Sequence, residues 1–132
     1  MKRSILLDTN ALLRLVRAPN SVAPAALAVL KDPESEVHVS AISAWEISIK
    51  TRLGRLDGEP LLSTWHDALE RMAMVELGVD SPDGILAGRL PWQHHDPFDR
   101  MLVAQATRRN LTIATSDARL IESSLTATLD TR

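Results

Sequence analysis

Cysteine is absent from the 132-residue sequence, which excludes disulfide bonds, thiol chemistry and zinc sites built on thiolates. Long hydrophobic runs are absent as well. The N-terminal stretch MKRSILLDTN begins with basic residues but has only three consecutive apolar residues before Asp8, too few for a signal-peptide core or a membrane span. We therefore expect a soluble, cytoplasmic protein that does not enter a membrane.

A surplus of positive charge is also missing, because 15 Lys and Arg residues face 17 Asp and Glu residues and the formal net charge is −2. A protein that attracts nucleic acid through its overall field carries a basic surplus, so any such substrate must be held by local contacts here. The sequence has no G-x-x-x-x-G-K or G-x-G-x-x-G phosphate loop and no G-x-S-x-G nucleophile turn. It therefore gives no sign of nucleotide binding through such loops.

The length is that of one domain, which we expect to span residues 1–132 without a linker or internal repeat. Short apolar stretches predict strands at 4–7, 36–40, 74–77 and 111–117, with a fifth near 126–129. Helical spacing predicts helices at 9–18, 24–31, 43–54, 60–72 and 81–90, a long helix from Pro97, and a short one behind the fourth strand. Ser43 and Ser81 are the expected N-caps of two of these helices, and Gly54 is expected just past the end of the third.

Apolar strands that alternate with helices predict a parallel sheet covered on both faces. The expected fold is a three-layer α/β/α arrangement around a central parallel sheet of four to five strands. Right-handed crossovers bring the C-terminal ends of the strands and the N-terminal ends of the helices to one edge of the sheet. Open α/β sheets bind their ligands at this edge.

Four acidic residues are predicted to meet at that edge. Asp8 follows the first strand, Asp117 follows the fourth, and Glu46 and Asp99 lie in the first turns of two helices. Asp99 falls within the apolar stripe of its helix, where an uncompensated carboxylate is costly. If the four carboxylates converge, their repulsion calls for a cation, and oxygen ligands without Cys or His favour Mg²⁺ or Mn²⁺.

Each of these acids also has a local explanation. Asp8 and Asp117 are suitable N-caps, and Glu46 can pair with Lys50 one turn along its helix. The helix dipole favours Asp99 in a first turn, but by only about 0.3–1 kcal/mol, which is too little to explain its inward direction.

Three further polar residues precede or open the helix of Asp99. His94 and His95 are adjacent, a spacing poorly suited to joint metal binding, and we expect them to be solvated in a loop. Asp96 directly precedes Pro97 and is most simply the N-cap of the helix, with a supporting role near the metal as the alternative.

Four segments in order, LLDTNALL, SAISAWEISIK, HHDPFDRMLVAQA and TIATSDARL, resemble the PIN domain, in particular the VapC-like toxins of bacterial type II toxin–antitoxin pairs. The resemblance covers nearly the whole chain and shows no departure at an acidic position. It carries the acidic set of the family onto Asp8, Glu46, Asp99 and Asp117, the hydroxyl position of the fourth strand onto Thr115, and a supporting polar residue onto Asn10.

The resemblance implies a Mg²⁺- or Mn²⁺-dependent endoribonuclease that is usually a homodimer and is silenced by a small VapB-like antitoxin. Ions held by carboxylates can activate a water molecule and neutralise charge on the phosphodiester, so the chemistry of the residues agrees with it. We expect Asp8 and Asp99 to be the principal ligands, Glu46 to be a ligand or the base for the water, and Asp117 to be a further ligand.

Arg100 and Arg119 are candidate contacts to the RNA backbone, although for each residue alone a solvated charge on a helix surface is the simpler explanation. The alternative function is a PIN-like module that binds RNA or a protein without cutting. The identity of the RNA depends on the shape of the groove and the loops, which the sequence does not give.

Overall fold

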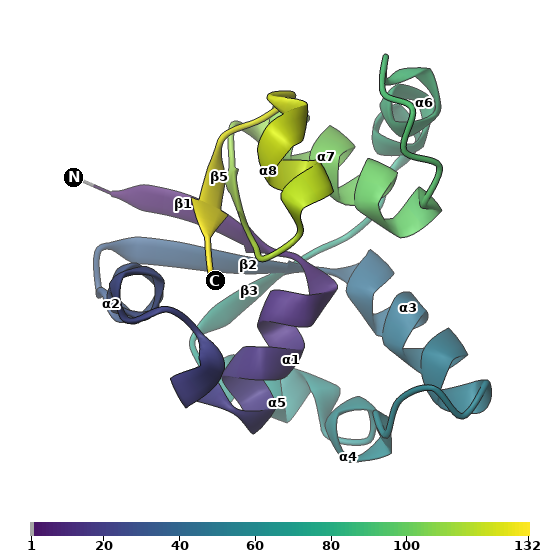
Figure 1. The fold of residues 1–132 in the computed structure, drawn as a ribbon. Helices are drawn as coiled ribbons and strands as arrows, with labels where there is room; N and C mark the ends of the chain where they lie inside the picture. The colour runs from purple at the N-terminus through teal and green to yellow at the C-terminus, as the bar shows by residue number, and fades with distance from the viewer. Residues whose placement is uncertain (1) are drawn as a thin grey trace.

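A computed structural model describes residues 2–132 of the chain (Figure 1). One sheet contains five strands, and a helix follows each of its three inner strands. The strands are β1 (Arg3–Leu7), β2 (Ser35–Ser40), β3 (Met74–Leu77), β4 (Thr112–Thr115) and β5 (Thr128–Asp130). The helices are α1 (Thr9–Arg17), α2 (Pro24–Lys31), α3 (Ala41–Arg52), α4 (Glu59–Leu62), α5 (Trp65–Arg71), α6 (Ser81–Arg89), α7 (Pro97–Arg109) and α8 (Ala118–Ser123), with a 3-10 turn at Pro19–Ser21.

All strand pairs are parallel, in the order β3-β2-β1-β4-β5. In Figure 1, α1, α2, α4 and α5 lie on one face of the sheet and α6, α7 and α8 on the other. The three-layer parallel fold predicted from the sequence is therefore confirmed, with five strands.

Both faces of the central strand, β1, are buried over residues 5–7, which explains why these three residues are all apolar rather than alternating. Ile5 and Leu7 pack into the cluster formed with α1 and α5, whereas Leu6 packs into the cluster formed with α7. All three side chains are at most 1% exposed. β1 thus fixes the position of the residue that follows it, Asp8, between two packed layers.

The start of α3 corrects one expectation. Ser40, not Ser43, is the N-cap: its backbone is extended and its hydroxyl accepts a hydrogen bond from Ile42 N at 3.1 Å. Because the helix begins earlier, Glu46 lies in its second turn rather than its first. Ser43 is buried inside the helix, and its hydroxyl is 2.9 Å from that of Thr9. Gly54 follows the helix with φ +73°, as predicted for its C-terminal end.

Two other helices differ from the predicted ones. Asp80, not Ser81, caps α6, because its carboxylate accepts from Asp83 N while the Asp83 carboxylate accepts from Asp80 N. The helix predicted from 60 to 72 is broken into α4 and α5 between residues 62 and 65. Asp96 is the N-cap of α7, as predicted, and accepts hydrogen bonds from Phe98 N and Asp99 N.

The strand order reverses between β1 and β4, since the chain moves outward from β1 to β3 on one side and then crosses to β4 on the other. At such a point the connections after two neighbouring strands diverge and leave a crevice at the C-terminal edge. Asp8 follows β1 and Asp117 follows β4, so both stand at this crevice. None of the helices in residues 2–132 is long and apolar enough to cross a membrane.

Candidate functional site

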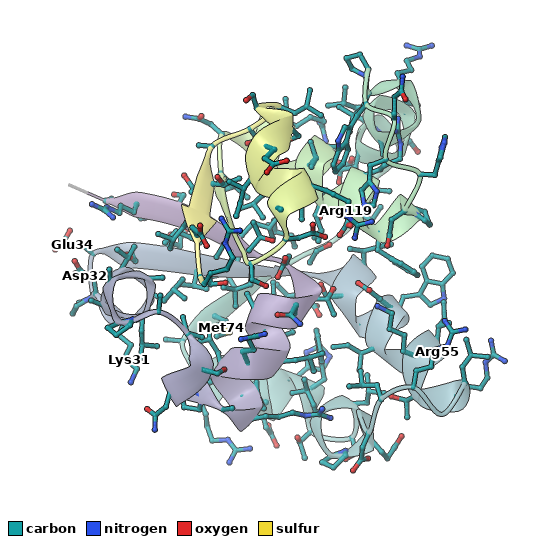
Figure 2. The ribbon with its side chains drawn as sticks, viewed as in Figure 1. Lys31, Asp32, Glu34, Arg55, Met74 and Arg119 are labelled. Carbon is teal, nitrogen blue, oxygen red and sulfur yellow. The ribbon has the colours of Figure 1, made fainter. Side chains whose placement is uncertain are left out.

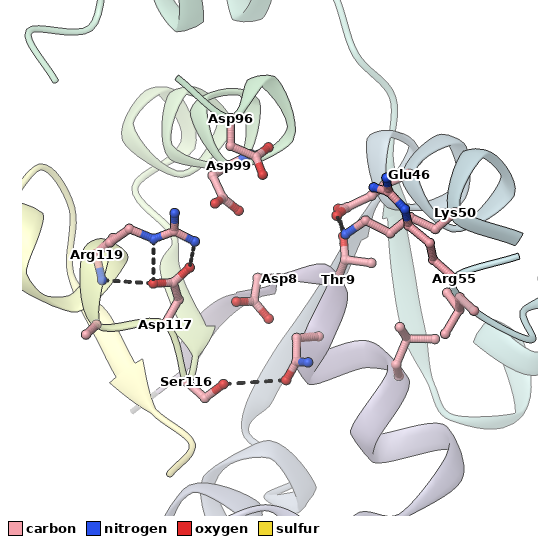
Figure 3. A pocket seen from close by; sticks show the side chains of 14 residues that line it. Asp8, Thr9, Glu46, Lys50, Arg55, Asp96, Asp99, Ser116, Asp117 and Arg119 are labelled. Carbon is pink, nitrogen blue, oxygen red and sulfur yellow. Dashed lines mark hydrogen bonds and ion pairs between the residues drawn. The ribbon is translucent and has the colours of Figure 1, made fainter. Parts of the chain in front are cut away.

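A pocket of about 610 Å³ opens at the C-terminal edge of the sheet, where β1 and β4 end (Figure 3). Figure 2 shows Arg55 and Arg119 on this side of the molecule and Lys31, Asp32 and Glu34 on the other. All four predicted acids line the pocket, and they reach it from four separate segments of the chain: Asp8, Glu46, Asp99 and Asp117.

Asp8 lies at the centre of the pocket and is only 5% exposed. Its Oδ1 accepts a hydrogen bond from Ala11 N at 2.7 Å, so the residue also caps α1. Burial raises the pKa of the Asp8 carboxyl to about 6, against hydrogen bonds from Thr115 and Ala11. The charges of Asp99 and Asp117 raise this pKa further. Asp8 therefore serves as a helix cap and as a desolvated carboxylate beside two others.

Glu46 forms the α3 wall of the pocket and is 6% exposed. Thr9 Oγ1 donates a hydrogen bond to its Oε1 at 2.6 Å, and Lys50 Nζ forms an ion pair with its Oε2. The pairing of Glu46 with Lys50 expected from their spacing is confirmed. The same contact holds Lys50 at the pocket, so its ammonium is also a lining group.

Asp99 enters the pocket from the first turn of α7, and Figure 3 shows its side chain directed toward Asp8. Its Oδ2 lies 2.7 Å from His94 Nε2, and a carboxylate only accepts, so the imidazole N–H donates. Burial raises the pKa of Asp99, against the hydrogen bond from His94, and the charges of Asp96 and Asp117 raise it further. The sequence prediction that His94 would be solvated is wrong, because its side chain is 10% exposed.

Asp117 closes the side of the pocket opposite Glu46. It caps α8, and the guanidinium of Arg119 donates to both of its oxygens at 3.2 and 3.0 Å. These hydrogen bonds from Arg119 lower the pKa of Asp117, so this acid is ionised more readily than Asp8. Thr115 is fully buried, and its hydroxyl accepts from Asp117 N at 2.9 Å. Asn10 is an exposed lining residue whose Oδ1 accepts from Arg14 Nε and Ser116 Oγ.

Arg100 has a different position from the one predicted. Its guanidinium donates to the main-chain oxygens of Ala87, Leu90, Trp92 and His94 at 2.7 to 3.0 Å. It is not among the residues that line the pocket. The donors of Arg100 are thus used to hold the loop between α6 and α7, and we withdraw it as a candidate contact to RNA.

The donor set of the pocket suits a hard divalent cation. In the described part of the chain, one set of three potential ligands has its atoms within 4.8 Å of one another, namely His94, Asp96 and Asp99, and Asp99 is the only one of the four predicted acids in it. Asp8 adds a carboxylate whose ionisation is opposed by burial and by the charges of Asp99 and Asp117, and would be favoured by a bound cation. Carboxylate oxygens without thiolates are the ligands of Mg²⁺ and Mn²⁺.

Two lining residues had no signal in the sequence. Arg55 lies in the loop after α3, is exposed, and forms no ion pair within residues 2–132. Thr9, which orients Glu46, reads in the sequence only as the first residue of a helix. Their positions at the pocket depend on the tertiary arrangement of α1, α3 and a loop, which no local sequence pattern specifies.

The raised pKa of Asp8 predicts how the stability of the metal-free protein depends on pH. Folded Asp8 binds its proton more tightly than unfolded Asp8, so the free energy of unfolding should fall as pH rises from about 4 to about 6. A shift of this size corresponds to about 3 kcal/mol. Asp8→Asn keeps the helix cap and should remove this contribution, so in EDTA its advantage over wild type should grow across that range.

Urea unfolding at pH 4 and pH 7.5, with EDTA present, measures this difference. An advantage of Asp8→Asn that is the same at both pH values would show that Asp8 is not desolvated in the folded protein.

The comparison with protein families decides what kind of domain carries this pocket: the model of the PIN domain matches residues 5–123. The chain belongs to the PIN domain family. The resemblance read from the four sequence segments is thereby confirmed. None of the curated protein sequences compared with this PIN domain matches it.

Solved structures share the PIN fold of this chain at low sequence identity. VapBC2 from Rickettsia felis, bound to a DNA fragment from its promoter, aligns with a TM-score of 0.71 at 13% identity over 98% of this chain and 99% of the other. VapBC-1 from nontypeable Haemophilus influenzae gives 0.68 at 16% identity, covering 96% and 97%. A toxin–antitoxin complex from Klebsiella pneumoniae gives 0.66 at 16% identity, covering 95% of each chain.

Proposed function

We propose that this PIN domain is a VapC-like toxin, a Mg²⁺- or Mn²⁺-dependent endoribonuclease that acts in the cytoplasm. One observation carries the proposal: carboxylates from four separate segments line a single pocket, and the central one, Asp8, is 5% exposed and lies beside two others. A protein gains nothing in stability from gathering such charges, so the arrangement fits a bound cation and chemistry on a phosphodiester.

Asp8, Asp99 and Asp117 would hold the ion, and Asp96 lies beside them on the rim. A bound Mg²⁺ or Mn²⁺ would lower the pKa of a water ligand and neutralise charge on the phosphoryl oxygens and on the leaving 3′-oxygen. Glu46 is oriented by Thr9 and can accept the proton of the attacking water at a carboxylate oxygen. Thr115 and Asn10 support the strand ends and α1 around these acids.

Basic side chains on opposite sides of the pocket are suited to the backbone of a single RNA strand. Figure 3 shows Arg119 on one side and Lys50 and Arg55 on the other, with Asp8 between them. Phosphates on either side of the cleaved bond would contact these cations. Such local contacts would hold the RNA although the protein as a whole has a net charge of −2. Arg119 therefore stays a proposed RNA contact, and Lys50 and Arg55 join it.

We propose two protein partners for this chain. A small VapB-like antitoxin would cover the pocket, with a cationic side chain among the carboxylates in place of the metal charge. A second copy of the chain would form a homodimer, for which exposed apolar side chains along α3 are available. Trp45, near the start of the helix, is 58% exposed and packs edge-on against Phe98 at 5.5 Å, and Leu53, at the opposite end, is 50% exposed.

Expression without the antitoxin should arrest growth, and Glu46→Gln should relieve the arrest. The glutamine still accepts from Thr9 and keeps the shape of the site, but it no longer accepts a proton. Glu70→Gln is the matched control, because Glu70 is exposed on α5 and away from the pocket, and it should remain toxic. Growth curves and protein levels after induction, with RNA-end sequencing to find the cut sites, measure the effect.

Equal toxicity of Glu46→Gln and Glu70→Gln, at equal abundance of folded protein, would contradict the assigned site. Arrest without new RNA ends would favour the alternative function, a PIN-like module that binds RNA or protein without cutting.

A further inference from the structure

His94 occupies an unusual place for a histidine in a surface loop. It lies in the connection between α6 and α7, yet its side chain is only 10% exposed. The imidazole ring packs edge-on against the Trp92 ring, with 4.8 Å between the ring centroids and 60° between the ring planes. The neighbouring His95 is exposed and makes no side-chain hydrogen bond within residues 2–132.

The main chain around His94 is held as firmly as its ring. Arg100 Nη1 donates to the carbonyl oxygens of Trp92 at 2.7 Å and His94 at 3.0 Å, and its Nε donates to Ala87 O at 2.8 Å. Arg100 lies on α7, one residue beyond Asp99. The same helix therefore carries the acid and the arginine that fixes the loop opposite it.

His94 Nε2 and Asp99 Oδ2 are 2.7 Å apart, a short distance typical of a hydrogen bond to a charged acceptor. This contact engages Oδ2, and no hydrogen bond within residues 2–132 engages Oδ1. The backbone of Asp99 is fixed as well, because its N–H donates to Asp96 Oδ1 at 3.2 Å. Both the backbone and the side chain of Asp99 are thus held before any ligand arrives.

We propose that His94 is a positioning residue: it fixes the orientation of the Asp99 carboxylate, and through this carboxylate it would favour binding of the cation. The proposal rests on the metal-dependent function proposed above. Its physical basis is preorganisation, since a ligand already fixed in the binding geometry loses less conformational freedom when the ion binds. Partners that orient metal ligands in this way commonly change metal affinity by about 10 to 100-fold when they are removed.

The test is Mn²⁺ binding to the purified, RNA-free protein, measured by calorimetry with thermal melting in EDTA alongside. His94→Ala should weaken Mn²⁺ binding by about tenfold or more. His94→Gln places an amide N–H near the position of Nε2 and should recover most of the affinity. His95→Ala, one residue away and without a partner, should bind as wild type does.

Two results would overturn the proposal. One is wild-type affinity in His94→Ala. The other is a folded His94→Gln that binds as weakly as His94→Ala, which would point to direct ligation by the imidazole. If His94→Ala does not fold, His94→Gln and His95→Ala decide between these outcomes, because only the positioning role predicts near-normal binding in both.

The same experiment separates this proposal from the proposed function. If wild type and Asp99→Asn show the same lack of Mn²⁺ binding, the metal site itself is wrong and the role of His94 falls with it. If wild type binds Mn²⁺ and Asp99→Asn does not, the metal site is supported, and the His94 variants then decide whether His94 is a positioning residue.

Discussion

Asp99→Asn is expected to lower RNA cleavage by about 10²- to 10³-fold while the metal-free protein melts at the same temperature as wild type or higher. The loss of activity follows from removing a charge that acts on the reacting phosphate through the cation, a type of contact worth about 10²–10³ in rate. The gain in stability follows from the raised pKa of Asp99, since burial and the neighbouring acids make its charge unfavourable in the folded protein.

The melting temperatures of wild type and Asp99→Asn should also differ in how they respond to Mn²⁺. Mn²⁺ at about 100 times its dissociation constant stabilises a protein that binds it only when folded by about 2.7 kcal/mol. Wild type should therefore melt at a higher temperature in Mn²⁺ than in EDTA, and Asp99→Asn should gain much less. Asp67→Asn is the control, because Asp67 is an exposed first-turn acid on α5. It should respond to Mn²⁺ as wild type does.

A structural carboxylate would behave differently. If Asp99 served only to stabilise α7 or to pair with His94, its replacement would destabilise the protein equally in EDTA and in Mn²⁺. That pattern, together with unchanged cleavage, would contradict the role of Asp99 as a metal ligand.

Among the variants described, Asp83→Ala is expected to lower the free energy of unfolding most, by on the order of 3 kcal/mol, which corresponds to a fall of roughly 10 °C in melting temperature. Asp83 is fully buried at the start of α6. Its oxygens accept from Arg108 Nη1, from both Nη atoms of Arg109 and from Gln105 Nε2. Burial opposes the charge, but the hydrogen bonds from Arg109 and Arg108 outweigh it and hold the pKa of Asp83 well below its usual range.

The cost arises because the alanine variant removes the acceptor shared by Gln105 and two guanidinium groups, of which only Gln105 and Arg108 keep a hydrogen bond, to Gly78 O and to Asp80. It also removes half of the capping box of α6. Asp130→Ala is the control, since Asp130 also accepts from an arginine, Arg132, but at an exposed position near the C-terminus. Its melting temperature should stay close to that of wild type. Urea unfolding of both variants measures the difference, and equal unfolding midpoints would show that the Asp83 network does not connect α6 to α7 as described.

The sequence predicts the fold well because its strands are buried on both faces. Runs such as SILL and TIAT have adjacent apolar residues at their centres or ends rather than alternating ones, which is typical of a sheet covered by two helical layers. The placement of Asp8 and Asp117 at one edge follows from this topology. The adjacency of β1 and β4 does not follow from it, because strand order depends on which faces the crossing helices cover.

Local sequence patterns are less informative about where a helix begins. Ser40 and Ser43 are both suitable N-caps, and the choice falls on Ser40 because β2 runs directly into α3. In the same way, Asp80 precedes Ser81 and forms the capping box with Asp83 that the serine would not form. The earlier start of α3 places Glu46 in the second turn of the helix without removing it from the pocket.

The partners of the site residues were the least predictable part. His94 contacts Asp99 across a helix start, and Arg100 turns away from the pocket to bind the loop main chain. Both contacts depend on the path of residues 90–96, a loop with no periodicity to read. In sequence terms His94 and His95 are equivalent, and only the tertiary structure distinguishes the buried one from the exposed one.

The most direct test of a metal-dependent ribonuclease at this pocket is cleavage of a labelled single-stranded RNA by wild type and Asp99→Asn, purified in parallel and assayed in EDTA and then in Mn²⁺. We predict cleavage by wild type in Mn²⁺ alone and at least about 10²-fold less by Asp99→Asn under the same conditions. Cleavage that persists in EDTA, or equal cleavage by the two proteins in Mn²⁺, would contradict the account.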